Sequence, residues 1–456
     1  MRVAVIGAGA AGLGTARHLL AEGIDVEVLE RDERLGGVWS YGRPPGRVYR
    51  STHMISSKPF TQFPDYPMPD SLPDYPHHAD VLAYLDGYAE HFGLNEVIRY
   101  GEDVVDIRPE AGTSAGAGGT ATTAEEAASA NISSWSSAPT WRVRTADGTE
   151  RVYDAVVIAN GHNAEPRWPE LPGRFDGVAL HSAEYHTPEI FDGKRVLVMG
   201  AGNSGCDIVV EAAQVAERAF LSMRRGYHYL PKHVLGRPVD QIGDLLLRLR
   251  LPLWLRRWIA GLAVRLTAGS PRRVGLPEPD HRLFETHPIV NTLLPYYVRH
   301  GRIEPRPDVA ALEGDRVRFV DGAEEPVDVI VFATGYALDF PFIDPALLNW
   351  RDGRPRLFLN VFHPRLETLF VAGMIQTDSG VFGLVHWQAR AIALSLRALR
   401  DARPAVDWLR SVRRDVATDL AGGVRYTGSS RHLLEVEHWS YQRRLKKLVR
   451  ELERRV

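Results

Sequence analysis

Three glycines at fixed spacing follow a short apolar run at the start of the chain. Val3–Ile6 leads into Gly7-Ala-Gly9-Ala10-Ala11-Gly12 and then into a helical stretch to about residue 22. A phosphate reaches the backbone amides of a helix N-terminus only where no side chain holds it off, so this spacing predicts a pyrophosphate site. Glu30 stands 18 residues after Gly12, where a carboxylate can accept both hydroxyls of an adenosine ribose. The alternative for Glu30 is a solvated charge at a strand end.

The same pattern returns far downstream. Arg195–Met199 leads into Gly200-Ala-Gly202-Asn203-Ser204-Gly205 and a helical stretch to about residue 216. The residue 18 positions after Gly205 is Met223, and Arg224 and Arg225 follow it. Guanidinium groups attract a ribose 2′-phosphate that a carboxylate would repel, so this second site is expected to prefer NADPH to NADH. The alternative is an ordinary exposed pair of arginines.

The elements around these turns predict how the chain is divided. Each turn joins an apolar strand to a helix, so the expected fold class is α/β, with two Rossmann-like dinucleotide-binding domains. The strands at 155–161 and 329–335 end alike, in Ala-Asn-Gly and Ala-Thr-Gly. Because the later strand lies beyond the second glycine turn, we expect the second domain to be inserted in the first. The boundaries expected are 1–165 and 305–400 for the first domain, 166–304 for the inserted domain and 401–456 for a helical C-terminal extension.

Residues 111–138 interrupt the first domain with a composition of their own. Of these 28 residues, 23 are Ala, Gly, Ser or Thr, without an apolar period. The stretch predicts a flexible surface insertion.

Composition and charge exclude several classes of protein. The chain has 456 residues, of which 44% are hydrophobic and 25% charged, as in ordinary globular proteins. Its 55 Lys and Arg against 57 Asp and Glu leave no basic surplus for nucleic acid. The single cysteine, Cys206, excludes an internal disulfide and a multi-thiolate zinc site, and no metal site is expected. One thiol and the lack of a signal peptide or long apolar run favour a cytoplasmic location.

Two dinucleotide sites in one chain need complementary roles. NADPH donates a hydride, and an enzyme that binds it beside a second dinucleotide commonly passes that hydride to a flavin. FAD is therefore the expected occupant of the first site and NADPH of the second. A disulfide reductase is excluded by the lone cysteine.

The segment from Phe175 to Tyr185 carries the most specific resemblance. Phe175-Asp-Gly177-Val-Ala-Leu-His181-Ser-Ala-Glu-Tyr185 matches, at every fixed position, the fingerprint F-x-G-x-x-x-H-x-x-x-[YF] of the flavin-containing monooxygenases, which are class B flavoproteins. The chain resembles this family over nearly its whole length except 111–138. His186 follows Tyr185, where the related Baeyer-Villiger enzymes would show Trp and then Pro or Asp, so the chain is more similar to N- and S-oxygenating members. The resemblance gives His181 a structural role in coupling the domains.

The resemblance also implies which residues contact the cofactors. The segment 35–39 is similar to the family's flavin-contacting G-G-x-W, 202–207 to its NADP loop, and 327–336, Gly373 and 388–390 to segments that return to the flavin. Cys206 is expected to be a small packing residue at a helix start. The cofactor-binding residues expected are Gly7, Gly9, Ala10, Ala11, Gly12, Glu30, Gly37, Val38, Trp39, Met54, Ile55, Gly200, Gly202, Asn203, Ser204, Gly205, Cys206, Asp207, Arg224 and Arg225.

One position departs from the family pattern. Residues 51–60 are similar to a T/S-N-x-x-K segment, and alignment on Lys58 puts Ile55 where the family places an Asn beside the flavin, with Met54 at the Ser or Thr position. Isoleucine cannot hydrogen-bond to a flavin oxygen adduct or to the nicotinamide. Either His53 or a backbone group takes over that role, or the adduct is shorter-lived.

The resemblance implies an NADPH-dependent monooxygenase that inserts one oxygen atom from O2 into an amine or sulfur substrate through a flavin C4a-hydroperoxide. The flavin would carry the chemistry, so no catalytic side chain is expected with certainty. Two alternatives stay open: an NADPH oxidase or reductase that releases peroxide, favoured by Ile55, and a non-catalytic FAD-binding sensor or scaffold. The sequence leaves both the substrate and the oligomeric state, including a homo-oligomer, undecided.

An amphipathic stretch runs from Leu245 to Leu266. Its apolar residues recur at helical spacing opposite several arginines. This pattern is typical of an interfacial membrane helix and also of a helix that covers an active-site entrance. The second interpretation is favoured, and peripheral membrane contact is the alternative.

Overall fold

The computed structural model describes residues 1–43, 46–110, 138–249, 251–267, 269–426 and 433–456. The insertion expected at 111–138 lies outside the described residues except for Ala138, so its flexibility stays a prediction.

A parallel sheet with the strand order β23-β7-β1-β2-β3 forms the centre of the first domain. Its middle strands are almost wholly buried, as expected for parallel strands covered on both faces. Because the order reverses at β1, the glycine turn that follows β1 lies at the switch point where such folds bind nucleotides. The strands are β1 (Arg2–Ile6), β2 (Asp25–Glu30), β3 (Ile98–Tyr100), β7 (Ala155–Ile158) and β23 (Leu369–Val371).

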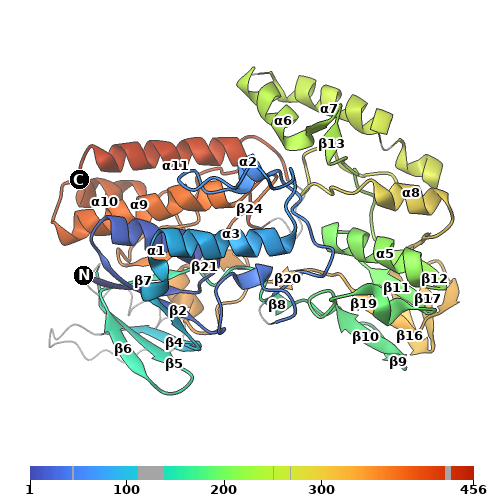
Figure 1. Cartoon of the computed structure of the whole chain (residues 1–456), viewed down its shortest axis with the longest axis horizontal. Helices are drawn as coiled ribbons and strands as arrows, with labels where there is room; N and C mark the ends of the chain where they lie inside the picture. Colours follow the sequence, from blue (N-terminus) through green and yellow to red (C-terminus); the bar gives the residue numbers. More distant parts are fainter. Residues whose placement is uncertain (44–45, 111–137, 250, 268, 427–432) are drawn as a thin grey trace.

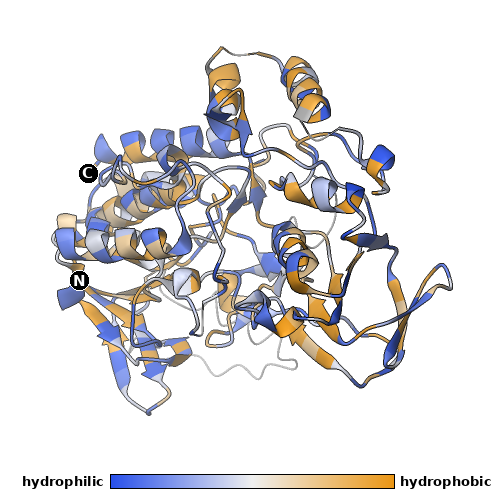
Figure 2. Ribbon diagram, turned by 45° about the vertical axis from the view of Figure 1, so that its right-hand side comes forward, coloured by the Kyte–Doolittle hydropathy of each residue, from blue (hydrophilic) through white to orange (hydrophobic). Residues whose placement is uncertain are grey.

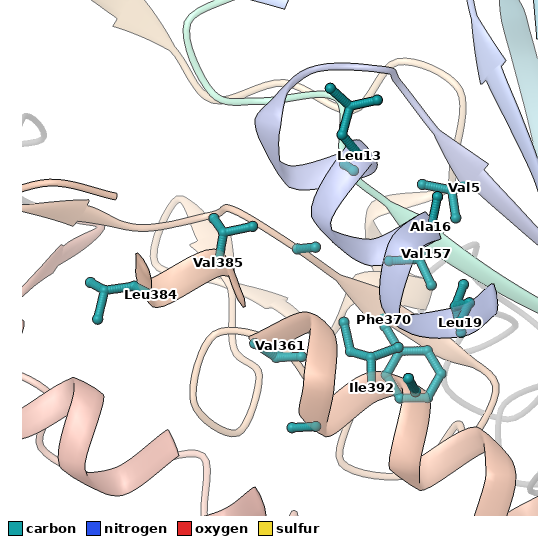
Figure 3. Close-up of a cluster of buried hydrophobic side chains, with 14 of the residues drawn as sticks. Val5, Leu13, Ala16, Leu19, Val157, Val361, Phe370, Leu384, Val385 and Ile392 are labelled. Atoms are coloured by element: carbon teal, nitrogen blue, oxygen red, sulfur yellow. The ribbon is translucent and has the colours of Figure 1, made fainter. Parts of the chain in front are cut away.

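Helices pack in a layer on one face of this sheet (Figure 1). Helix α9 packs against α1 and α11 packs against α9, and Figure 3 shows Leu13 and Leu19 of α1 gathered with Ile392 of α9 and with Val5 and Val157 of the sheet. Helix α11 belongs to the same core, so the C-terminal segment is integral to the first domain. The helices are α1 (Ala10–Ala21), α3 (His78–His91), α9 (Phe382–Arg400), α10 (Ala405–Val412) and α11 (His438–Glu453).

The opposite face of the sheet is covered by an antiparallel sheet of β4 (Val104–Pro109), β5 (Trp141–Thr145) and β6 (Glu150–Tyr153). Trp141 is fully buried against this face, and its Nε1 donates a hydrogen bond of 2.9 Å to Oγ1 of Thr368. The first domain is therefore a helix–sheet–sheet sandwich with apolar side chains in both layers.

A second parallel sheet, with the order β10-β19-β11-β12-β15, forms the other domain. The boundary expected at residue 304 is wrong, because β19 pairs with both β10 and β11 in this sheet. The four residues of β19 are all apolar and buried, as in the central strands of either parallel sheet. Their sequence pattern therefore could not indicate which sheet the strand joins. The strands are β10 (Val178–His181), β11 (Arg195–Met199), β12 (Arg218–Ser222), β15 (Glu304–Arg306) and β19 (Val329–Phe332).

The second domain is inserted between two strands of the first. The two segments that connect the domains pair with each other. The chain leaves the first sheet after β7 and returns to it at β23. Between them, β8 (Glu165–Pro166) on the way in pairs antiparallel with β20 (Tyr336–Ala337) on the way out. A further antiparallel sheet of β16 (Val309–Gly314), β17 (Arg316–Phe319) and β18 (Glu324–Pro326), with β9 (Gly173–Phe175) at its edge, belongs to the inserted part.

Two helices stand out from the body above helix α8 (Leu293–Arg299) (Figure 1). The single helix expected from Leu245 to Leu266 is wrong, because α6 (Val239–Arg248) ends before Pro252 and α7 (Leu253–Thr267) begins after it. Hydrophobic residues recur along both helices (Figure 2). In α7, Trp254, Trp258 and Leu266 are 69%, 64% and 78% exposed, and in α6 Leu245 is 50% exposed. Within the described part of the chain, no helix is both long and apolar enough to span a membrane.

Candidate functional site

The first glycine turn is closed by backbone contacts that only glycine allows. Gly7 has φ +103°, and a Cβ at Gly12 would lie 1.8 Å from the carbonyl oxygen of Gly7. Gly9 is different, because a Cβ there would meet only the Cα of Gly37, at 3.9 Å. Its missing side chain leaves room beside the first turn of α1, where no side chain among the described residues caps the helix. This is the cradle that a pyrophosphate needs.

Glu30 closes the turn from the end of β2. Its Oε2 accepts from the backbone N–H of Ala8 at 2.6 Å and its Oε1 from that of Asp32 at 3.0 Å. Burial raises the pKa of Glu30. A carboxylate has about four acceptor positions, so these two bonds fix its orientation and leave lone pairs for ribose hydroxyls. The buried and oriented side chain argues against the solvated-charge alternative.

The segment 36–39 and the start of α9 meet the same turn. The backbone N–H of Gly36 donates to the carbonyl of Ala8 at 3.0 Å, and Gly37 lies beside Gly9. Val38 and Trp39 follow in the same short 3-10 helix. On the other side Gly373, with φ +77°, approaches Ala11 so closely that a Cβ would lie 2.7 Å from that of Ala11. Oε1 of Gln388 accepts from Gly373 N–H at 2.9 Å. The structure therefore brings Gly37, Gly373 and Gln388, which lie far apart in the sequence, close to the first glycine turn.

The second glycine turn repeats this construction. Gly200 has φ +107°, and a Cβ at Gly205 would lie 1.8 Å from the carbonyl oxygen of Gly200. Helix α5 (Asn203–Val215) begins there with Ser204 exposed, and no described side chain caps it. Cys206 is buried and packs against the carbonyl of Ala201, as expected for a small packing residue.

Asn203 and Asp207, both expected to contact the cofactor, use their side chains in hydrogen bonds within the protein. The amide of Asn203 donates to the carbonyl of Pro288 and accepts from Val290 N–H, both at 3.0 Å. Asp207 accepts from the hydroxyl of Tyr49 and from the amide of Asn291, both at 2.7 Å, and burial raises its pKa. These hydrogen bonds hold the start of α5 to residues 288–291 and to Tyr49. Tyr49 was missed because nothing in the sequence indicates that 49–51 crosses to α5.

Arg224 and Arg225 differ in their surroundings. Arg225 directs Nε and Nη2 to Oδ1 of Asp280, at 3.1 and 2.7 Å. Arg224 follows β12 and is exposed. Of the two, only Arg224 therefore presents a guanidinium with no ion-pair partner among the described residues where the 2′-phosphate is expected.

Ile55 lies against an apolar cluster between the domains and α7. The cluster consists of Leu230, Val264, Leu283 and Val290, with Ile55, Ala260 and Phe284 packed on it. The neighbouring backbone is tied to the helical pair, because the N–H of Ser57 donates to Asp240 at 2.6 Å. Met54, expected beside Ile55 in the flavin contact, is buried in the core of the first domain. His53 is exposed, and its Nδ1 contacts the carbonyl of Ser51 while its ring packs edge-on against His77, so it does not share the surroundings of Ile55.

His181 and Tyr185 connect the elements of the inserted domain. The ring of His181 is buried; its Nδ1 accepts from Ala183 N–H at 3.1 Å and its Nε2 contacts the carbonyl of Gly335 at 3.2 Å. Burial lowers the pKa of His181, so the ring is neutral near pH 7. The hydroxyl of Tyr185 donates to Glu211 of α5. These contacts tie the fingerprint segment to α5 and to the exit strand, in keeping with a structural role.

Each of the two parallel sheets has a glycine turn between a strand and a helix N-terminus, the arrangement with which Rossmann-like folds bind a dinucleotide. A model of the flavin-binding monooxygenase-like family matches residues 1–427. The chain is 32% identical over 463 residues to flavin-containing monooxygenase 5 of Oryctolagus cuniculus, covering 96% of this chain and 80% of that protein. It is 33% identical over 410 residues to dimethylaniline monooxygenase [N-oxide-forming] 2 of Mus musculus, covering 85% and 72%.

Solved structures share the fold at lower identity. S-allyl-L-cysteine S-oxygenase from Allium sativum superposes with a TM-score of 0.62 at 22% identity, covering 98% of this chain and 88% of that one. Cyclohexanone monooxygenase from Rhodococcus sp. Phi1, bound to NADP+, gives 0.67 at 18% identity, covering 99% and 97%. The chain belongs to the flavin-binding monooxygenase-like family. It is thus an FAD-dependent monooxygenase that uses NADPH. The two cofactors expected from the sequence, FAD and NADPH, are confirmed.

Proposed function

We propose that the enzyme transfers one oxygen atom of O2 to a soft nitrogen or sulfur nucleophile while NADPH is oxidised and the second oxygen atom leaves as water. Bound FAD supplies the redox and oxygen chemistry. The observation that carries the choice of substrate is the apolar cluster around Ile55.

The apolar cluster acts on the substrate through its protonation state. A protonated amine has no lone pair to attack with, and burial among apolar side chains disfavours the charged form. Ile55, Val264 and Phe284 offer no hydrogen-bonding side-chain group. They would hold a neutral amine or thioether by apolar contact, with selectivity set by size.

The remaining residues bind, orient and exclude water. The turns at Gly7–Gly12 and Gly200–Gly205 would hold the two pyrophosphates, Glu30 the ribose of FAD and Arg224 the 2′-phosphate of NADPH. Ala260 and Val264 of α7 belong to the same apolar cluster as Ile55, which supports the interpretation of this helix as a cover over the site. Its outward face bears Trp254 and Trp258, so contact with a membrane stays the alternative for that face.

A second candidate activity is the release of peroxide. Ile55 gives the site no side-chain hydrogen bond at the position where the family places an Asn. Without such a group, the two electrons of NADPH would reduce O2 to peroxide, and no oxygen atom would reach the substrate.

One pair of measurements separates these activities. Anaerobic mixing with NADPH should bleach the flavin; a flavin that stays oxidised would favour the non-catalytic alternative. In air, NADPH consumption is then compared with oxygenated product and with peroxide, using tertiary amines, thioethers and a cyclic ketone. Product that accounts for most of the NADPH with an amine or thioether supports the proposal. Peroxide equal to the NADPH used with every compound, or product from the ketone alone, contradicts it.

A further inference from the structure

A buried cluster of two histidines and an aspartate lies away from both glycine turns, between α1 and α9. His18 comes from α1, His386 from α9 and Asp65 from the segment that follows α2 (Lys58–Thr61). Both histidines are buried. The proposed function uses none of these side chains.

The three ligand atoms of the cluster lie close together. Nε2 of His18 lies 3.2 Å from Nδ1 of His386, and Nδ1 of His386 lies 3.3 Å from Oδ1 of Asp65. All three atoms lie within 4.8 Å of one another. Zinc binds nitrogen and oxygen at about 2.0 to 2.2 Å, which puts tetrahedral ligand atoms about 3.3 to 3.5 Å apart. The two shorter separations therefore match the edges of a metal-binding tetrahedron.

A proton on Nδ1 of His386 can serve the His18 nitrogen and the Asp65 oxygen together only as a shared, bifurcated donor, which is weaker than a linear hydrogen bond to either. Among the described residues, Arg17 and His386 are the neighbours of the Asp65 oxygens at ion-pair distance. A cation between the three ligand atoms would let all three act as electron-pair donors.

The surroundings orient the carboxylate without using its inward oxygen. Nε of Arg17 lies 2.8 Å from Oδ2 of Asp65 and so leaves Oδ1 directed at His386. Metal-binding carboxylates are commonly held in this way by a neighbouring donor. The guanidinium of Arg17 in turn lies over the ring of Phe92, 4.8 Å from its centroid.

We propose that His18, Asp65 and His386 bind one divalent transition-metal ion of borderline character, such as Zn2+. Two imidazoles and one carboxylate are ligands that suit this class of ion. The ion would tie α1, whose N-terminus carries the first glycine turn, to α9 and to the segment that follows Ile55. Its role would be to hold the FAD-binding domain together, with no part in the oxygenation. The sequence expectation of no metal site rested on the lone cysteine and did not consider ligands that come from three distant segments.

The test uses the untagged, flavin-loaded full chain, stripped with a chelator and dialysed against a low concentration of ZnSO4. Metal counted by mass spectrometry should be about one ion per chain in the wild type and should fall at least about fivefold in His386→Gln. Asp65→Asn, at the less buried edge of the cluster, tests the same site if His386→Gln loses its flavin. Zinc should also raise the Tm of the wild type and leave that of either variant unchanged.

The matched control is His281→Gln. His281 and Asp280 lie close to His228, but Nε2 of His281 contacts Oγ1 of Thr286 and Nε2 of His228 contacts the carbonyl of His281. This control should keep the bound zinc. A wild type that retains no zinc, or zinc that persists in both cluster variants, overturns the proposal, and so does loss confined to His281→Gln.

Discussion

Replacement of Arg224 by Ala should remove most of the preference of this enzyme for NADPH over NADH. Arg224 is exposed at the end of β12, whereas Arg225 already bonds to Asp280 through two nitrogens. A hydrogen bond to a charged group contributes about 1.5 to 3 kcal/mol, which corresponds to about a 10- to 150-fold loss in kcat/KM for NADPH. The value for NADH should not change, because NADH has no 2′-phosphate.

Arg225→Ala is the matched comparison. An exposed ion pair contributes about 0 to 1 kcal/mol, so this variant should change kcat/KM for NADPH by less than about fivefold. Asp280→Asn frees Arg225 and should leave the preference equal or slightly stronger. The assay is anaerobic reduction of the flavin by each nucleotide, followed by its absorbance. If Arg225→Ala abolishes the preference while Arg224→Ala retains it, the division of roles drawn from the Asp280 contact is refuted.

Three further predictions concern other parts of the molecule. Ile55→Asn restores a hydrogen-bonding side chain and should raise the ratio of product to NADPH consumed, with Ile55→Val as control; an unchanged ratio would mean that this position does not limit coupling. Gly12→Ala places a Cβ 1.8 Å from the carbonyl oxygen of Gly7 and should abolish FAD binding. Gly205→Ala makes the same clash with Gly200 and should keep the flavin but lose its reduction by NADPH. The visible spectrum distinguishes these outcomes, and a Gly12→Ala variant that retains its colour would contradict the first. Burial lowers the pKa of His363 to about 3, so its stabilising contribution is complete above its unfolded pKa near 6.5 and is lost as the pH falls. Between pH 7.5 and 5, the free energy of unfolding should drop by about 2 kcal/mol more in the wild type than in His363→Asn. Equal drops in urea titrations would refute this.

The sequence predicted those parts of the site that depend on local sterics. Gly12 and Gly205 have their positions because each helix packs back onto its own turn, a constraint contained within a few residues. Glu30 could be found in the same way, because its distance from Gly12 along the chain is set by one helix and one strand. Both domains follow from these two turns. The inserted order was inferred from the strand at 329–335, which belongs to the second sheet; the strand that returns to the first sheet is β23.

The parts that could not be predicted depend on contacts between distant segments. Asp280 changes the role of Arg225 from 55 positions away, and no local pattern indicates that contact. The strand Val329–Phe332 is apolar throughout and fits either sheet, so only its pairing with β10 and β11 assigns it. The substitution at Ile55 was visible in the sequence, but the apolar cluster that accommodates it comes from α7 and from residues 283–290.

The pairing of β8 with β20 has a consequence for how the enzyme can be taken apart. Pro166 lies opposite Tyr336, and the N–H of Arg167 donates to the carbonyl of Gly335 at 2.9 Å, so the two connecting strands are in register side by side. A tight two-residue hairpin joined across that ribbon would bypass the whole inserted unit without moving either flank. The polypeptide that remains would keep β1, β2, β3, β7 and β23 in one sheet, with the glycine turn that follows β1.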